Sequence, residues 1–561
     1  MSHPVADLIH RQYEAGKAQC VEGMRTVRTR GPGQVQFWLI ALFIGIAAGF
    51  AAVGFRVAIT WLQETIYGAN DTELATHLAG LHWGWVIAIP ILGGLAVGLI
   101  LKFFIPDGRT RTVAHVIEGA ALREGRVDER VGLASTLAAL VTLSTGGSTG
   151  REGPVVHIGA IISSRVSNLI HADGITGRDL MGCAAAAAVS ASFNAPIAGA
   201  LFAMEVVLRH FAVHAFAPIV IASVSGAVIS RLFVGDVTEF MLPVPTLAFY
   251  VELPAFMLLG LLCGLVGSLM MWVIFAAEDL ADTIQSTTRM PIWLRPAVAG
   301  ALLGGIAVFY PHIIGVGYET TSRALTEGLL FHEAVVFAVV KVAAVAITMA
   351  GRMGGGVFSP SLMLGGLTGL AFGILATAVF PAVSGTAGLY AIAGMGAVAA
   401  AVLGAPISTA LIVFEMTGDW QAGLAVMVTV SMSTALSSRL VDRSFFLTQL
   451  ERRGVHVAAG PQAYLMATIS VGRLMHTDHA TDPARMQKLE ELAASGWTLE
   501  ARDTLEKALP MFDRAEETVL PVVALSSDEN APVRVIGAIT QVDALKAYNK
   551  ALAETAREEH S

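Results

Sequence analysis

Long apolar segments constrain this chain more than any other feature of its sequence. Six segments contain at most one charged residue each and reach or approach the roughly 20 residues of a membrane span. The chain as a whole agrees, because 54% of its 561 residues are hydrophobic and only 14% are charged, against roughly 25% charged residues in a soluble protein. The sequence therefore predicts an all-α polytopic membrane protein. The six segments cover residues 37–55, 83–101, 215–229, 255–277, 334–350 and 362–380.

Other apolar segments are too short to cross a membrane. Residues 155–166 and 405–414 are bounded by glycine and proline, a pattern typical of broken or re-entrant helices. Such helices are tolerated at membrane depth only where they line a polar cavity. The 57 glycines fit this interpretation, since close helix packing and helix breaks both use glycine.

Two pairs of matching motifs indicate that the membrane body is duplicated. The run 194–205 (NAPIAGALFAME) resembles the run 404–415 (GAPISTALIVFE), with the same spacing from proline to glutamate. The other pair consists of two sets of glycine, proline and glycine, and the spacing between the three residues is the same in both sets. We therefore expect two halves of similar fold, which in transporters are usually inverted, with the substrate site where broken helices meet. The two sets are Gly150, Pro154, Gly159 and Gly356, Pro360, Gly365.

The glycine-rich turns around residues 146–159 and 355–361 are the candidate substrate site. Pro154 and Pro360 place a proline in the first turn of a helix, which leaves free backbone N–H groups pointing outward. These groups and the positive end of the helix dipole attract an anion without a full positive charge. A cation pathway would be expected to contain clusters of intramembrane Asp or Glu, whereas residues 355–361 carry no charge. The sequence favours a small anion.

Glu152 stands out because it places a carboxylate at the start of such a helix. A carboxylate at a helix N-terminus is stabilised by the dipole and acts as a tethered anion. The alternative is a structural ion pair with Arg151 or another nearby base.

Three runs together make the family recognisable: 150–154 (GREGP), 193–196 (FNAP) and 355–360 (GGVFSP). They resemble the signature motifs of the CLC family of chloride channels and proton-coupled chloride antiporters, and the resemblance extends from about residue 37 to 454. It implies a homodimer with one anion pathway per subunit, built from two inverted halves of tilted and broken helices. It divides the chain into a basic N-terminal segment (1–35), a transport domain (36–455) and a C-terminal module (456–561).

The resemblance also assigns roles to residues. Glu152 matches the gating glutamate, which competes with the anion and swings away when it is protonated or displaced. The backbone N–H groups of Val357 and Phe358 match those that hold the central anion. Arg151 matches a position with a structural role, for which Glu118 is the candidate partner. The anion-binding positions implied are Thr112, Arg151, Gly153, Gly356, Val357, Phe358 and Phe446.

Residues 111–115 (RTVAH) stand where the family usually has Gly-Ser-Gly-Ile-Pro. Thr112 replaces the serine whose hydroxyl donates to the anion, and threonine keeps that donor. Arg109 and Arg111 flank this turn and are expected either to raise the anion concentration at the inner mouth or to reflect only the positive-inside bias of a short loop.

Phe446 stands where the family has its central tyrosine, and it removes a phenolic donor. Anion occupancy should be weaker by about one hydrogen bond, on the order of 1 kcal/mol.

Val206 stands where proton-coupled members carry an inward-facing glutamate that transfers protons. Valine cannot carry a proton, so this position favours a passive channel. The neighbouring Glu205 is interpreted as a structural acid at a helix end, like Glu415 in the other half, with an alternative proton route as the second possibility.

His157 lies one helical turn inside the first anion helix, at a position where many family members have glutamine. The alternative is a pH-sensing role, but we expect a polar core residue with satisfied hydrogen bonds, as is usual for a single histidine in a packed helix.

The two ends of the chain are predicted to be cytoplasmic. The first 36 residues contain Arg11, Lys17, Arg25, Arg28 and Arg30 and no apolar core, so they are not a signal peptide and obey the positive-inside rule. We expect a bacterial inner (plasma) membrane protein.

The C-terminal module is acidic, with 16 Asp and Glu against 10 Lys and Arg in residues 462–561, which argues against nucleic acid as a partner. Its pattern predicts a helix (504–514), two strands (519–525 and 533–540) and an amphipathic helix (542–552). The run 537–543 resembles a CBS module, which makes Thr540 and Asp543 candidate contacts for an adenine nucleotide. A dimerisation role is favoured, because only one repeat fits.

The sequence offers no nucleophile–base pair or metal-ligand cluster, and Cys20, Cys183 and Cys263 match no metal or redox spacing. An enzyme is therefore not expected. The favoured function is a passive chloride channel gated by Glu152. The alternatives are a chloride/proton antiporter and, less favoured, an anion-responsive regulator that acts through the C-terminal module.

Overall fold

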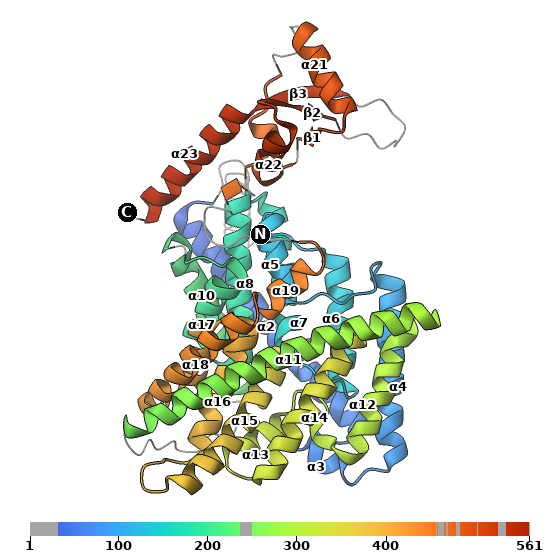
Figure 1. The fold of residues 1–561 in the computed structure, drawn as a ribbon, viewed down its shortest axis with the longest axis vertical. Helices are drawn as coiled ribbons and strands as arrows, with labels where there is room; N and C mark the ends of the chain where they lie inside the picture. Colours follow the sequence, from blue (N-terminus) through green and yellow to red (C-terminus); the bar gives the residue numbers. More distant parts are fainter. Residues whose placement is uncertain are drawn as a thin grey trace, which may run out of the picture.

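The computed structural model describes residues 32–211, 213–235, 250–455, 457, 465–466, 469–477, 483–501, 503–524 and 534–559. Most of the basic N-terminal segment, residues 1–31, lies outside the described residues. The described chain forms a helical membrane body with a small α/β module at one end (Figure 1). We call the face of the membrane body next to this module the module face, and the opposite face the far face.

Within the described residues, eight helices are long and apolar enough to cross a membrane. All six long apolar segments of the sequence fall in them, apart from residue 380 just after α15, so the prediction of a polytopic all-α membrane protein is confirmed. The spans involve α2 (Gln34–Tyr67), α4 (Trp83–Phe104), α10 (Val213–Val234), α11 (Leu253–Thr288), α12 (Arg295–Phe309), α14 (Phe331–Ala350), α15 (Phe358–Val379) and α18 (Trp420–Leu440).

Two series of four helices repeat the same order. The first is α7 (Glu152–Ile170), α8 (Gly174–Phe193), α9 (Pro196–Phe202) and α10, and the second is α15, α16 (Ala387–Leu403), α17 (Pro406–Thr417) and α18. The helices α7 and α15 begin at the same place inside the body, and Figure 1 shows α7 nearer the module face and α15 nearer the far face. The two halves are therefore inverted copies, as the sequence motifs predicted.

The matched glycines of the two halves permit matched close packing. A Cβ atom on Gly159 would lie 2.9 Å from the carbonyl oxygen of Ala184 in α8. A Cβ atom on Gly365 would lie 2.2 Å from the carbonyl oxygen of Gly394 in α16. Only glycine allows these two helix pairs to approach so closely.

Shorter elements complete the membrane body. Asp128 starts α6 by accepting a hydrogen bond from the Val131 N–H (3.1 Å), so the helix begins with a side-chain cap. The shorter elements are α3 (Leu74–Leu78), α5 (Val113–Leu122), α6 (Glu129–Ser144), the π-helical turn η1 (Ala203–Leu208), η2 (Tyr250–Glu252), η3 (Ile292–Leu294), η4 (Pro311–Ile313), α13 (Tyr318–Leu325) and α19 (Phe445–Glu451).

The C-terminal module has a three-stranded sheet in the order β1-β2-β3, with β1 parallel and β3 antiparallel to β2. The predicted helices and strands are present, although residues 525 and 533 lie outside the described chain, and α21 and β1 were not predicted. The elements are η5 (Val471–Arg473), α21 (Pro483–Ala494), β1 (Leu499–Glu500), α22 (Leu505–Ala515), β2 (Val519–Val523), β3 (Val535–Thr540) and α23 (Gln541–Glu559).

Candidate anion pathway

Two backbone hydrogen bonds join the glycine-rich turns of the two halves. The N–H of Gly150 donates to the carbonyl of Gly356 (2.7 Å), and the N–H of Gly356 donates back to the carbonyl of Gly150 (2.8 Å). Gly355 has a φ of 139°, and a Cβ atom there would lie 2.1 Å from Oγ1 of Thr149. Glycine is therefore required at this junction, which directs the N-termini of α7 and α15 to one point.

Glu152 is the first residue of α7, and its side chain is buried, with 3% of the residue exposed. Its Oε1 accepts a hydrogen bond from the hydroxyl of Ser359, the second residue of α15. A Cβ atom on Gly150 would lie 2.6 Å from its Oε2. The carboxylate of one half therefore lies at the helix N-terminus of the other, where a free anion would be expected to bind.

Val357 and Phe358 start α15 with buried side chains. The Phe358 ring packs against Phe193 and Phe202, with centroid distances of 4.8 and 6.3 Å. This packing fixes the first turn of α15. The first backbone N–H groups of α15 have no acceptor within the helix, because they stand at its N-terminus. Gly153 and Gly356 meet beside this turn, because a Cβ atom on Gly153 would lie 3.4 Å from the Gly356 Cα.

Arg151 does not pair with Glu118, so that expectation was wrong. The Arg151 guanidinium is buried and lies 5.1 Å from the centre of the Tyr318 ring. Glu118 pairs instead with Arg123 (2.5 Å) and Arg453 (3.3 Å). Arg123 follows α5 and Arg453 follows α19, whereas Arg151 belongs to the turn before α7.

Thr112 and Phe446 lie apart from this turn, on two elements that meet nearer the module face. Thr112 precedes α5, and its hydroxyl donates to Oε1 of Gln449 on α19 (3.1 Å). Phe446 is buried on the same helix, beside Phe445 at a centroid distance of 6.0 Å. The Thr112 hydroxyl must leave Gln449 before it can donate to an anion.

A cavity of about 220 Å³ lies between α5, α11, α14 and α19, and Thr112, Gly355 and Gln449 line part of it. We call it the vestibule. Its charged lining comprises Arg109, Arg295, Arg352, Arg452 and Arg453 together with Glu278, Asp279 and Asp282.

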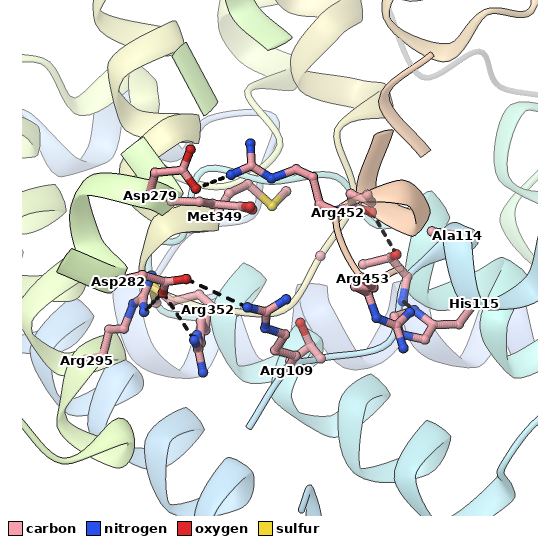
Figure 2. Close-up of a pocket in the computed structure, with 16 residues that line it drawn as sticks. Arg109, Ala114, His115, Asp279, Asp282, Arg295, Met349, Arg352, Arg452 and Arg453 are labelled. Carbon is pink, nitrogen blue, oxygen red and sulfur yellow. Dashed lines mark hydrogen bonds and ion pairs between the residues drawn. The ribbon is translucent and has the colours of Figure 1, made fainter. Parts of the chain in front are cut away.

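The ion pairs of the vestibule leave an excess of positive charge. Figure 2 shows the guanidinium groups of Arg109, Arg295 and Arg352 directed toward Asp282. Asp279 pairs with Arg452. Five arginines face three carboxyl groups here, so the vestibule attracts anions. Arg111 lies outside this lining and pairs with Asp107 (2.8 Å).

Comparison with known proteins identifies the family. The family model described as "Voltage gated chloride channel" matches residues 93–438. The chain belongs to this family, the CLC family. It is therefore an integral membrane protein of CLC type that transports anions.

Individual relatives agree with this assignment. A ClcB-like protein of Ralstonia nicotianae, whose name marks it as a candidate chloride channel protein, is 32% identical over 69% of this chain and 90% of its own length. The H(+)/Cl(-) exchange transporter ClcA of Klebsiella pneumoniae is 28% identical over 77% of this chain and 92% of its own length. In fold, the chain resembles a slow cyanobacterial Cl-/H+ antiporter, with a TM-score of 0.64, 22% identity and coverage of 74% of this chain and 97% of that chain.

In this CLC protein, Val206 is buried in η1 and the neighbouring Glu205 caps a helix. The Glu205 carboxylate accepts hydrogen bonds from the N–H groups of Ile407 (3.0 Å) and Ser408 (2.7 Å) and from the Ser408 hydroxyl (2.7 Å). Glu205 therefore caps the start of α17, which agrees with its interpretation as a structural acid at a helix end.

His157 departs from expectation. It is buried, with 2% of the residue exposed, but neither ring nitrogen has a hydrogen-bond partner among the described residues. The expectation of a satisfied core histidine was wrong, because the polar groups nearby are engaged with one another. Ser359 and Gln449 were also missed, although Ser359 lies in the run 355–360 that carried the family resemblance.

In the C-terminal module, Thr540 and Asp543 bond to each other at the start of α23. The Thr540 hydroxyl donates to Oδ2 of Asp543 (2.5 Å), and the Asp543 N–H donates to the Thr540 hydroxyl (3.1 Å). The ring of His476 lies 3.0 Å from the same carboxylate oxygen. The hydrogen bond from Thr540, with that from His476, holds the pKa of Asp543 below its usual value.

No group of three or more His, Cys, Asp or Glu residues that could hold a metal ion occurs among the described residues.

Proposed function

We propose that this protein is a chloride/proton antiporter in which Glu152 is the gate and the outer proton carrier. The observation that carries the proposal is the position of the Glu152 carboxylate at the N-terminus of α15, hydrogen-bonded to Ser359. A carboxylate in this position leaves either when chloride competes for the same helix N-terminus or when protonation removes the charge that the helix dipole attracts. One side chain therefore responds to both ions.

The relatives support antiport over a passive channel. The Klebsiella relative is named an exchange transporter, and the solved structure of similar fold is titled an antiporter. The channel expectation depended on Val206, which removes one proton site but leaves Glu152 in place.

Purified protein in liposomes tests the proposal. A chloride gradient should drive protons against their own gradient, and the reversal potential should shift with pH. A reversal potential fixed at the chloride Nernst value, with no proton movement, would contradict antiport. The E152Q variant should still move chloride but should lose proton movement and pH dependence, because glutamine cannot be protonated in this range.

We further propose that the module face is cytoplasmic, that the membrane is the plasma membrane and that two chains form a homodimer. The basic residues before residue 36 support the topology through the positive-inside rule. The family resemblance supports the dimer. Chemical cross-linking in native membranes should give a band of twice the chain mass. A band of the single-chain mass alone would contradict the homodimer.

For the CBS-like module we propose dimerisation rather than nucleotide binding. Thr540 donates a hydrogen bond to Asp543, and the His476 ring contacts the same carboxylate oxygen. These contacts support a structural role for Thr540 and Asp543. Titration of the full chain with AMP and ATP should give no binding heat. Binding that T540A abolishes would favour the nucleotide instead.

A further inference from the structure

One carboxylate of the vestibule is shared by three arginines. The Asp282 carboxylate lies 3.2 Å from the Arg352 guanidinium and 3.7 Å from that of Arg109, and it also pairs with Arg295. Figure 2 shows these three side chains directed toward the single acid. Because one carboxylate carries one negative charge, it neutralises at most one of the three guanidinium groups. Two positive charges remain in excess within this group of four residues.

Arg109 and Arg352 keep N–H donors that no described protein group uses. The Arg109 guanidinium lies beyond hydrogen-bond distance of Asp282, and Arg352 donates only from Nη2, to Oδ1 of Asp282 (3.2 Å). The buried Arg295, in contrast, donates three hydrogen bonds to protein oxygens. Arg109 and Arg352 both line the vestibule, with 47% and 16% of their side chains exposed. Since a guanidinium has five N–H donors, both can bind a further acceptor in the cavity.

Arg352 occupies a backbone position that usually belongs to glycine. Helix α14 ends at Ala350, and Arg352 follows Gly351 with a φ of 57°, in the left-handed region. Helices often end on a residue in this conformation, which is usually glycine because a Cβ atom is disfavoured there. This chain has its glycine one position earlier and an arginine at the left-handed position. Such conformations are typical of functional positions, which supports a role for the Arg352 side chain.

The available donors suit an oxyanion better than chloride. A guanidinium presents paired N–H groups that match two oxygens of an oxyanion, whereas chloride is a single spherical acceptor. Five arginines against three carboxyl groups leave two positive charges in the vestibule, which match a divalent ion. The cavity of about 220 Å³ is smaller than the roughly 300–1,000 Å³ of pockets for drug-sized ligands. It therefore fits a small inorganic oxyanion rather than a nucleotide.

An ion bound in the vestibule stands in the path of chloride toward the N-terminus of α15. Gly355, three residues before the start of that helix, lines the cavity together with Thr112 and Gln449. The Thr112 hydroxyl is hydrogen-bonded to Gln449 (3.1 Å). A tetrahedral oxyanion is larger than chloride and would have to part this contact before it moved on. It is therefore held in the vestibule and not transported.

We propose that the vestibule binds a small divalent oxyanion of the phosphate or sulfate class, held by Arg109 and Arg352, which blocks chloride movement. Asp282 engages the same guanidinium groups and competes with the oxyanion, so binding is reversible. The proposal rests on the anion pathway described above and does not depend on proton coupling.

The test measures chloride movement in phosphatidylcholine liposomes with sulfate on both sides, at an ionic strength held constant with gluconate. Sulfate should inhibit the wild type. R109Q and R352Q should each raise the half-inhibitory sulfate concentration roughly tenfold, because each removes charge-assisted hydrogen bonds. Inhibition is expressed relative to the rate of the same variant without sulfate. R165Q removes an exposed arginine outside the vestibule lining and, as the matched control, should leave the value unchanged.

D282N should have the opposite effect. The amide removes the competing negative charge but keeps a carbonyl acceptor for Arg295, so the half-inhibitory sulfate concentration should fall several-fold. A purely structural role of these residues predicts no gain in sulfate affinity from D282N. Isothermal titration of the purified full chain with sulfate measures binding directly and should place the variants in the same order.

The outcomes decide the proposal separately from antiport. A wild type that neither binds sulfate nor is inhibited by it would overturn the proposal. Equal inhibition of the wild type, R109Q and R352Q would overturn it too, because the oxyanion would then act elsewhere. If R352Q does not survive purification, R109Q decides. A wild type that moves chloride without protons would overturn antiport and leave the oxyanion site intact.

Discussion

Glu205 and Glu415 each cap a helix of the opposite half. The Glu205 carboxylate accepts from the N–H groups of Ile407 and Ser408 at the start of α17. The Glu415 carboxylate accepts from the N–H groups of Ile197 (3.0 Å) and Ala198 (2.7 Å) at the start of α9. The two acids thus tie the inverted halves together, which satisfies helix N-termini that would otherwise lack acceptors.

This reciprocity predicts that E205A destabilises the protein without changing proton coupling. Alanine leaves two N–H groups without acceptors, which should lower the free energy of unfolding by about 1–3 kcal/mol. Thermal denaturation in detergent measures the loss, and E415A is the matched control with an equal expected effect. A lower proton-to-chloride ratio at unchanged thermal stability would show that Glu205 carries protons.

A second prediction concerns Phe446. F446Y should restore a phenolic donor and tighten chloride binding by on the order of 1 kcal/mol, or roughly fivefold in dissociation constant. Isothermal titration with chloride measures the change. F445Y adds the same hydroxyl to the neighbouring ring, which stacks on Phe275 at 5.1 Å, and should not improve binding. Equal effects of the two variants would remove Phe446 from the pathway.

A third prediction follows from the positive vestibule. R452Q should reduce the chloride transport rate several-fold at low ionic strength, because it removes one attracting charge. The difference should vanish near 1 M salt, where the screening length is about 3 Å. R165Q removes an exposed arginine on α7 that pairs with Glu129, outside the vestibule lining, and should have little effect. A deficit that persists at high salt would indicate a structural role for Arg452.

The membrane body could be predicted because its signals are local. Long apolar runs and equal motif spacings are visible without knowing which helices touch. Helix α18 was missed because its serines dilute the apolar pattern. In the structure these hydroxyls bond to helix carbonyls, as Ser431 does to Met427 and Ser433 to Ala397, so they are compatible with a membrane helix.

The site could be predicted only in part, because several of its contacts join distant residues. Glu152 was found from its motif, but its contact with Ser359 spans 207 positions. Glu118 was matched with the wrong base, because it pairs with Arg123 and also with Arg453, which is 335 positions away. Whether His157 would find a partner depended on how α6, α7 and the residues before α5 pack, which the sequence does not state.

The last prediction concerns pH and the C-terminal module. Because Thr540 and His476 hold the pKa of Asp543 below its usual value, the ionised carboxylate stabilises the folded module. This contribution is fully present above the unfolded pKa of about 3.9 and is lost as pH falls through the lower folded value. The D543N variant should therefore weaken the start of α23 at pH 7 and differ less from the wild type as the pH approaches 3. Hydrogen exchange of the α23 amides in the full chain, corrected for intrinsic rates, measures the weakening at pH 7 and the smaller difference near pH 3. If the exchange rates of D543N and the wild type differ by the same factor at pH 7 and near pH 3, the charge of Asp543 contributes nothing to the stability of the module.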